Sequence, residues 1–80
     1  MAKERVKFTF PATLIKEPVI HNMSVKYDVI TNIRRANVTK DKGWVVLELE
    51  GRREAIDKAI GSVTALGVRV DPVEGDVIEG

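Results

Sequence analysis

The hydrophobic residues of this 80-residue chain change their spacing along the sequence, and the order of those changes limits the folds open to it. Val6, Phe8 and Phe10 alternate with polar residues, which is typical of a strand with one buried face. From Pro18 to Tyr27 the apolar residues follow helical spacing, and Pro18 suits the first turn of a helix because its missing N–H costs nothing there. The start of the chain therefore predicts a strand followed by a helix.

A similar succession follows in the rest of the chain. The remaining predicted elements are a strand at Asp28–Val38, a hairpin turn at Thr39–Gly43, a strand at Trp44–Glu50, a helix from Gly51 or Arg52 to Leu66, and a strand at Val68–Val70. Gly43 is expected to take the left-handed conformation in the turn, and Gly67 to cap the second helix. Gly61 weakens a helix by about 1 kcal/mol relative to Ala, so it predicts close packing on the sheet.

The order strand, helix, strand, strand, helix, strand is that of the split βαβ arrangement. Right-handed crossovers would place both helices on one face of a four-stranded antiparallel sheet. The expected fold class is therefore α+β, a ferredoxin-like, ACT-like two-layer sandwich. One domain is expected over residues 1–80, with its core at 4–72 and an acidic tail at 73–80, in which Val77 and Ile78 could extend a sheet edge. This fold hosts enzymes, RNA-binding domains and ligand sensors, so it assigns no function.

The run Asp28–Val38 does not alternate as a simple half-buried strand does. Each of its two faces would mix apolar and polar side chains. A β-bulge near Arg34 and Arg35 explains this pattern, and so does an outer sheet face that is itself half covered. A bulged or edge strand with solvated arginines is the simplest interpretation.

The predicted hairpin also suggests an interface. If Val38 pairs opposite Trp44, then Ala36 lies opposite Val46, and these side chains form one apolar patch on the sheet face away from the helices. An exposed apolar patch of this kind is typical of an interaction surface. The predicted interface residues are therefore Ala36, Val38, Trp44 and Val46.

Composition argues against several classes of site. The chain has no cysteine and one histidine, which excludes iron–sulfur ligation and a His-rich metal site, and no cofactor is expected. No apolar run approaches the ~20 residues of a membrane span and no signal peptide is visible, so a cytoplasmic location without membrane insertion is expected. There is no phosphate loop ending in Gly-Lys-Ser/Thr, and Pro11-Ala12-Thr13 replaces the loop of an acylphosphatase. Only Trp44 could stack on RNA bases, so no catalytic residue and no nucleic-acid partner are predicted.

Five segments of the chain together resemble one known family. They are Phe-Thr-Phe-Pro, Glu-Pro-Val-Ile, Tyr-Asp-Val-Ile-Thr-Asn-Ile-Arg-Arg-Ala-Asn-Val, Val-Leu-Glu-Leu-Glu-Gly and Leu-Gly-Val-Arg-Val, in this order. From Val6 to Val70 the chain resembles the NIL domain. In that family the domain lies at the carboxyl end of methionine-importer ATPases, where it dimerises and binds methionine to inhibit transport, and it also occurs fused to ferredoxins.

The resemblance implies a ligand site. Asn32 and Ile33 match the first two positions of the family's Asn-Ile-Leu signature, and Asn32 resembles the position whose side chain lies near bound methionine. Arg34 replaces the leucine of the signature, and an arginine there can hold a carboxylate. The expected ligand-binding residues are therefore Asn32, Ile33 and Arg34.

Two functions remain open from the sequence. The first is a non-catalytic regulatory module that forms a homodimer and binds methionine or a related sulfur amino acid. As a free-standing copy it would act with a transporter ATPase or a ferredoxin-type protein on another chain. The alternative is a protein interaction adaptor that binds no small molecule, and a calorimetric titration with methionine distinguishes the two.

Overall fold

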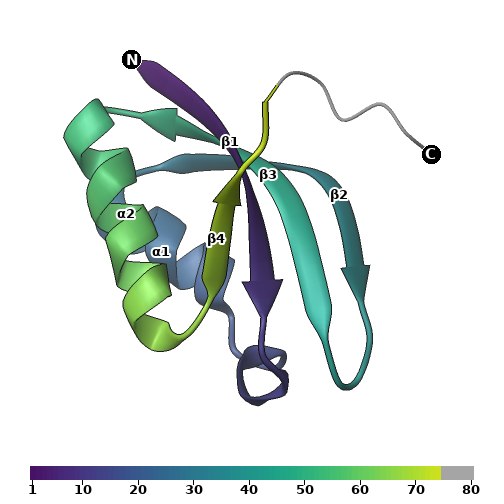
Figure 1. The fold of residues 1–80 in the computed structure, drawn as a ribbon. Coiled ribbons are helices and arrows are strands. Elements are labelled where there is room, and N and C mark those ends of the chain that lie inside the picture. The colour runs from purple at the N-terminus through teal and green to yellow at the C-terminus, as the bar shows by residue number, and fades with distance from the viewer. Residues whose placement is uncertain (75–80) are drawn as a thin grey trace.

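The structure is a computed structural model that describes residues 1–74 of the chain. Its elements are β1 (Ala2–Phe10), η1 (Ala12–Leu14), α1 (Val19–Tyr27), β2 (Ile30–Val38), β3 (Gly43–Gly51), α2 (Arg53–Leu66) and β4 (Arg69–Pro72), as labelled in Figure 1. This order confirms the α+β, ferredoxin-like prediction. The predicted extension of a sheet edge by Val77 and Ile78 lies outside the described residues.

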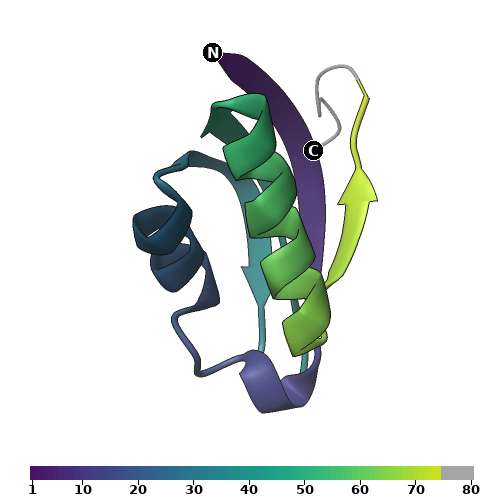
Figure 2. The same cartoon turned by 90° about the vertical axis from the view of Figure 1, so that its left-hand side faces the viewer.

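The four strands form one antiparallel sheet in the order β2-β3-β1-β4. The first and third strands of the chain therefore occupy the centre, and β2 and β4 form the two edges. Both helices lie on one side of the sheet, as the two views in Figures 1 and 2 show, and no helix among residues 1–74 covers the other side. We call the helix-free side the uncovered face.

The core lies between the helices and the central strands. Val6, Phe8 and Phe10 point into it from β1, as their alternation predicts, and the two phenylalanine rings meet edge to face with centroids 6.1 Å apart. From β3 the core receives Leu47 and Leu49, which are fully buried. The helices contribute Val19, Met23, Ile56, Ala59 and Val63.

Residues in the left-handed region end both helices. Gly67 follows α2 with a φ of 111° and donates its N–H to the carbonyls of Val63 and Thr64, which confirms the predicted cap. Asp28 follows α1 with a φ of 57°, a conformation that aspartate tolerates better than most side chains. Beside it, the Ser24 hydroxyl donates to the carbonyl of Val29 at 2.6 Å, which fixes the start of β2.

Two other glycines differ from the predictions. The hairpin turn is closed by Thr39, whose N–H donates to the carbonyl of Lys42 at 2.7 Å, and Gly43 already belongs to β3 without a positive φ. An added Cβ at Gly43 would lie 3.3 Å from both methyl groups of Val38, so lack of space and not backbone conformation favours glycine there. The expectation of close packing at Gly61 is also wrong, because an added Cβ there would meet nothing within 4 Å.

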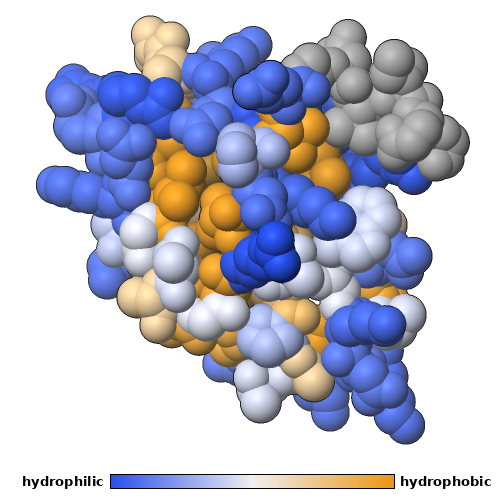
Figure 3. All heavy atoms as spheres, in the orientation of Figure 1, coloured by the Kyte–Doolittle hydropathy of each residue, from blue (hydrophilic) through white to orange (hydrophobic). Residues whose placement is uncertain are grey.

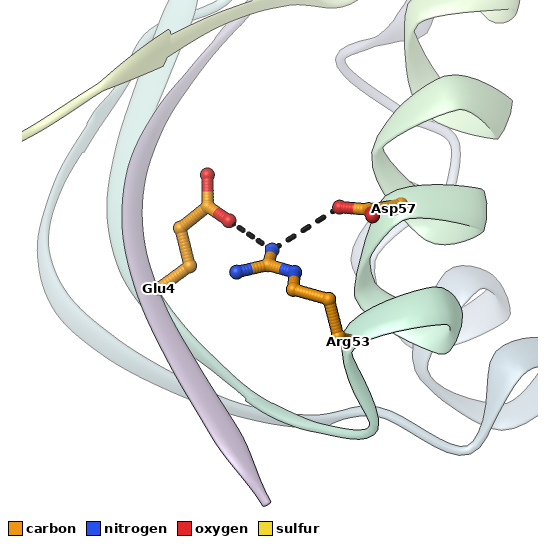
Figure 4. A network of polar contacts seen from close by, with 3 residues as sticks. All are labelled: Glu4, Arg53 and Asp57. Carbon is orange, nitrogen blue, oxygen red and sulfur yellow. Dashed lines mark hydrogen bonds and ion pairs between the residues drawn. The ribbon is translucent and has the colours of Figure 1, made fainter.

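A polar network links β1 to the start of α2 (Figure 4). The guanidinium group of Arg53 donates hydrogen bonds to Glu4 of β1 and, at 3.2 Å, to Asp57 one turn along its own helix. The hydrogen bond to Glu4 raises the pKa of Arg53 above its ordinary value, so the group stays charged. Because the network lies at the surface, it orients α2 more than it stabilises the fold.

Candidate functional site

The predicted ligand-binding residues lie on β2, which is an edge strand. Its nine residues pair with β3 along one side. Its other side forms the edge of the sheet in Figure 1, and no strand within residues 1–74 pairs with it. An open edge presents unpaired N–H and C=O groups that a further strand can bind.

A β-bulge interrupts the pairing between β2 and β3. Ile33 lies opposite Leu47 and Arg35 opposite Val46, so Arg34 is the extra residue with no counterpart on β3. This confirms the predicted bulge near Arg34 and Arg35 and explains the mixed alternation of the sequence, because a bulge shifts the parity of the strand by one residue.

The bulge decides where the three predicted ligand-binding residues lie. Asn32 is opposite Glu48 and belongs to the uncovered face, whereas Ile33 is opposite Leu47 and belongs to the helix side. Arg34 lies at the bulge between them. All three side chains are exposed, and Ile33 leaves 55% of its surface open to solvent. The three residues therefore form a rim on the open edge and not a closed pocket.

The predicted apolar patch is not formed, because the pairing differs from the expected one by one residue. Val38 lies opposite Gly43 and Asn37 opposite Trp44, while Ala36 lies opposite the core residue Val45. The cause is the turn, which contains four residues where five were expected because Gly43 pairs within β3. Ala36 and Val38 consequently lie on the helix side, and Trp44 and Val46 on the uncovered face.

The uncovered face is charged more than apolar, as the blue side chains across the sheet in Figure 3 illustrate. The Lys7 ammonium lies 5.2 Å from the centre of the Trp44 ring, and the Arg35 guanidinium carbon lies 5.9 Å from it. Val46 has both cations as register partners and is only 5% exposed, although it points away from the helices. Further along the same face Arg5 and Glu48 form an ion pair at 3.1 Å. The expectation of an apolar sheet face is therefore wrong.

A cavity of about 230 Å³ opens on the helix side, at the end of β2 where Val38 lies. Its walls come from four segments of the chain and include Ile15, Pro18, Ile20 and Val45, with Glu17 and His21 among the lining residues. Sequence reasoning did not find this cavity, because no single motif holds its lining residues. It is not lined by Asn32, Ile33 or Arg34, so it is separate from the predicted ligand residues.

Neither a metal site nor a membrane-spanning helix is found in the described part of the chain. Among residues 1–74 no three or more His, Cys, Asp or Glu side chains come together in a way that could hold a metal ion. None of the helices in this part of the chain is long and apolar enough to cross a membrane.

Comparison with known families gives a clear result, because the model of the NIL domain matches residues 4–72. The chain belongs to the NIL domain family. A search of curated proteins gives no match.

Solved structures support the NIL fold. The C-terminal domain of an ABC transporter ATP-binding protein from Enterococcus faecalis is similar with a TM-score of 0.77 and 22% sequence identity, over 91% of this chain and 86% of that one. The de novo designed protein Ferredog-Diesel is similar with a TM-score of 0.54 and 12% identity, over 88% of this chain and 84% of that one. At such low identities these likenesses describe the architecture alone.

Proposed function

We propose that this NIL domain is a non-catalytic regulatory module that dimerises along β2 and binds methionine or a related amino acid at that strand. One observation supports the proposal most strongly. The open edge of β2 carries the exposed residues Asn32, Ile33 and Arg34 in succession, and no strand of residues 1–74 pairs with the main-chain groups on that side. These residues offer an amide, an apolar surface and a cation, which are the three kinds of contact that an apolar amino acid requires.

Dimerisation along β2 would satisfy the main-chain groups of the open edge. Two copies related by a two-fold axis would pair their β2 strands antiparallel and join the two sheets. Ile30, Ile33 and Val38 of the strand are each more than half exposed. Burying such half-exposed side chains stabilises an interface by about 1 kcal/mol each.

The charges on β2 link dimerisation to the ligand. Arg34 is the middle residue of the strand, so symmetric pairing about the strand centre brings Arg34 of the two copies close together. Like charges directly opposite each other destabilise strand pairing. A ligand carboxylate held between them would remove this repulsion through charge-assisted hydrogen bonds. The ligand would therefore favour the dimer.

Calorimetric titration of the purified chain with methionine tests the ligand. We expect heat of binding, and we expect Asn32→Ala and Arg34→Ala each to weaken the affinity by about tenfold, as for the loss of one hydrogen bond to a charged group. Asn22→Ala and Arg52→Ala are matched controls, because both residues are exposed and lie away from β2. Absence of heat with methionine and its close relatives contradicts the proposal.

Sedimentation velocity with and without methionine tests the dimer. We expect methionine to shift the chain toward a dimer and Ile33→Glu to keep it monomeric, because a buried unpaired carboxylate opposes association. Val25→Glu is the matched control, since Val25 is 68% exposed but lies on α1. If both variants behave alike, β2 is not the interface.

The second candidate function is an adaptor that binds a strand of another protein and no small molecule. It is favoured by Arg34 and Arg35, because two adjacent cations in the middle of β2 suit an acidic partner strand better than a second copy. The partner would be a transporter ATPase or a ferredoxin-type protein. A chain that stays monomeric and gives no heat with methionine, yet binds such a protein only while Ile33 is intact, would support the adaptor.

A further inference from the structure

Trp44 lies on the uncovered face between two cations that come from different strands. Thr9 of β1 and Asn37 of β2 are its register partners, and Lys7 and Arg35 lie two residues away on the same strands. The ring attracts both positive groups through its π electrons, at 5.2 Å for Lys7 and 5.9 Å for Arg35. Two side chains of like charge are thus held near one ring, which creates a fixed positive site.

A hollow of about 320 Å³ adjoins this site at the hairpin end of the sheet. Trp44 and Lys42 line it together with Thr9, Asn37 and Thr39. The Thr39 hydroxyl is engaged in the turn, where it donates to the Lys42 carbonyl and accepts from the Lys42 N–H. The side chains of Thr9 and Asn37 make no hydrogen bond to other groups of residues 1–74, so they remain available to a ligand.

The charges around the hollow favour an anion. Within residues 1–74, Lys7 and Arg35 lie beside the ring and Lys42 lines the hollow. Asp71, the acidic register partner of Lys7, is engaged by Arg69 at 3.1 Å, and Asp41 lies in the turn. The acidic residues of β3 on this face, Glu48 and Glu50, lie toward the opposite end of the strand, and Glu48 is paired with Arg5. Among the described residues, Lys7 and Lys42 therefore give the end of the face that holds Trp44 a positive charge.

We propose that this end of the uncovered face binds a nucleoside phosphate, with the base against Trp44 and the phosphate at Lys42 and Lys7. An aromatic side chain is a stacking platform for a base, and lysine is a common phosphate ligand. Asn37 and Thr9 supply the hydrogen-bonding groups that a base edge or a ribose needs. The hollow lies within the range of about 300–1,000 Å³ that small-molecule sites occupy.

A phosphate-bearing molecule without a ring fits these observations less well, because Trp44 would then be unnecessary for binding. An RNA-binding sheet of the usual kind fits less well too, because it uses two or three aromatic side chains and this face has one. The site also differs from the one proposed on β2. Asn32 pairs with Glu48, whereas Trp44 pairs with Asn37, and the bulge lies between Asn32 and Asn37.

Fluorescence offers a direct test, because Trp44 is the one tryptophan of the chain. We would titrate the full chain with AMP, with ribose 5-phosphate and with adenosine, and confirm the affinities by calorimetry. AMP should change the emission of Trp44 and bind at least about tenfold more tightly than either half, since both the base and the phosphate contribute. Raising the salt concentration should weaken AMP binding, because exposed charges are screened.

Substitutions distinguish AMP binding at this site from a general attraction of the phosphate to positive charge. Lys42→Ala should weaken AMP binding by about tenfold, as for loss of a charge-assisted hydrogen bond, while Lys58→Ala on α2 should not change it. Trp44→Leu, read by calorimetry with the fold checked by circular dichroism, should reduce AMP to the affinity of ribose 5-phosphate. Equal affinity for AMP and ribose 5-phosphate, or no binding of AMP, overturns the proposal. If a single-stranded oligonucleotide binds more tightly than AMP, the site still recognises a nucleoside phosphate, but one that belongs to a nucleic-acid strand.

Discussion

Strands β2 and β3 are both nine residues long and pair with each other in one hairpin, yet they differ in nearly every property that matters for function. Leu47 of β3 is fully buried, whereas its direct partner on β2, Ile33, leaves 55% of its surface exposed. Both side chains point to the helix side of the sheet. The comparison shows that the place of a strand in the sheet, more than its composition, decides whether an apolar residue serves the core or a surface.

Leu47 is buried and Ile33 is exposed because β3 has more neighbouring elements in the fold than β2. The core strand β3 lies between β2 and β1, and α2 packs on its helix side. The edge strand β2 has one paired neighbour within the described residues, and Ile33 and Val38 each leave 55% of their surface exposed. The apolar side chains of β2 are therefore available for recognition at little cost to the stability of the fold.

The largest expected effect concerns the pair Leu47 and Ile33. Leu47→Ala should lower the free energy of unfolding by roughly 3 kcal/mol, because it leaves a cavity in the core. Ile33→Ala removes a similar amount of side chain from the same side of the sheet, yet it should cost less than about 1 kcal/mol, because that surface is already in contact with water. Urea unfolding of both variants measures the difference. Equal losses would mean that Ile33 is buried in solution, for example by a second copy.

The same comparison explains how much of the fold could be predicted from the sequence. Alternation in β1 and helical spacing in α2 reflect burial of one face, so the order of elements, the core of β1 and the Gly67 cap are confirmed. The bulge at Arg34 is also confirmed. It shifts the alternation of the strand by one residue, so that Ile33 and Ala36 lie on the same side of the sheet. Local patterns were sufficient wherever burial dictates the residue type.

The candidate site was less predictable, because it depends on register and on distant neighbours. The predicted turn was one residue longer than the turn in the structure. The prediction therefore placed Ala36 and Val38 on the wrong face, since a shift of one residue reverses every side chain of a strand. The cations beside Trp44 come from β1 and β2, and neither sequence pattern indicates that they meet across β3. For Asn32, Ile33 and Arg34 a ligand role remains a prediction.

A smaller effect is expected at the pair Glu48 and Asn32, which are opposite each other on the uncovered face. Glu48 holds Arg5, and the two side chains are only 21% and 16% exposed. Glu48→Ala should destabilise the domain by about 1 kcal/mol, because it removes a carboxylate that forms an ion pair with a partly buried cation. Asn32→Ala should change the stability by less than about 0.5 kcal/mol. Urea unfolding is the measurement, and an equal loss in both variants would mean that the Arg5 ion pair contributes nothing.

A small effect on stability, with the sharpest change in the surface, is expected from deletion of Arg34. Without it Ile33 and Arg35 become neighbours and still face Leu47 and Val46, so every other side chain of β2 keeps its side of the sheet. We expect the free energy of unfolding to change by less than about 1 kcal/mol, because the hairpin pairing becomes regular. The edge, however, becomes flatter and loses a charge, and both changes favour pairing with another strand.

Sedimentation velocity should therefore show more self-association for the Arg34 deletion than for the unmodified chain. Arg34→Ala is the matched control, because it removes the charge and keeps the bulge. Stronger association of the deletion than of Arg34→Ala would show that the bent backbone restrains the open edge. Equal association of the two would assign that restraint to the charge, and unfolding of the deletion would mean that β2 needs its bulge to fit the edge of the sheet.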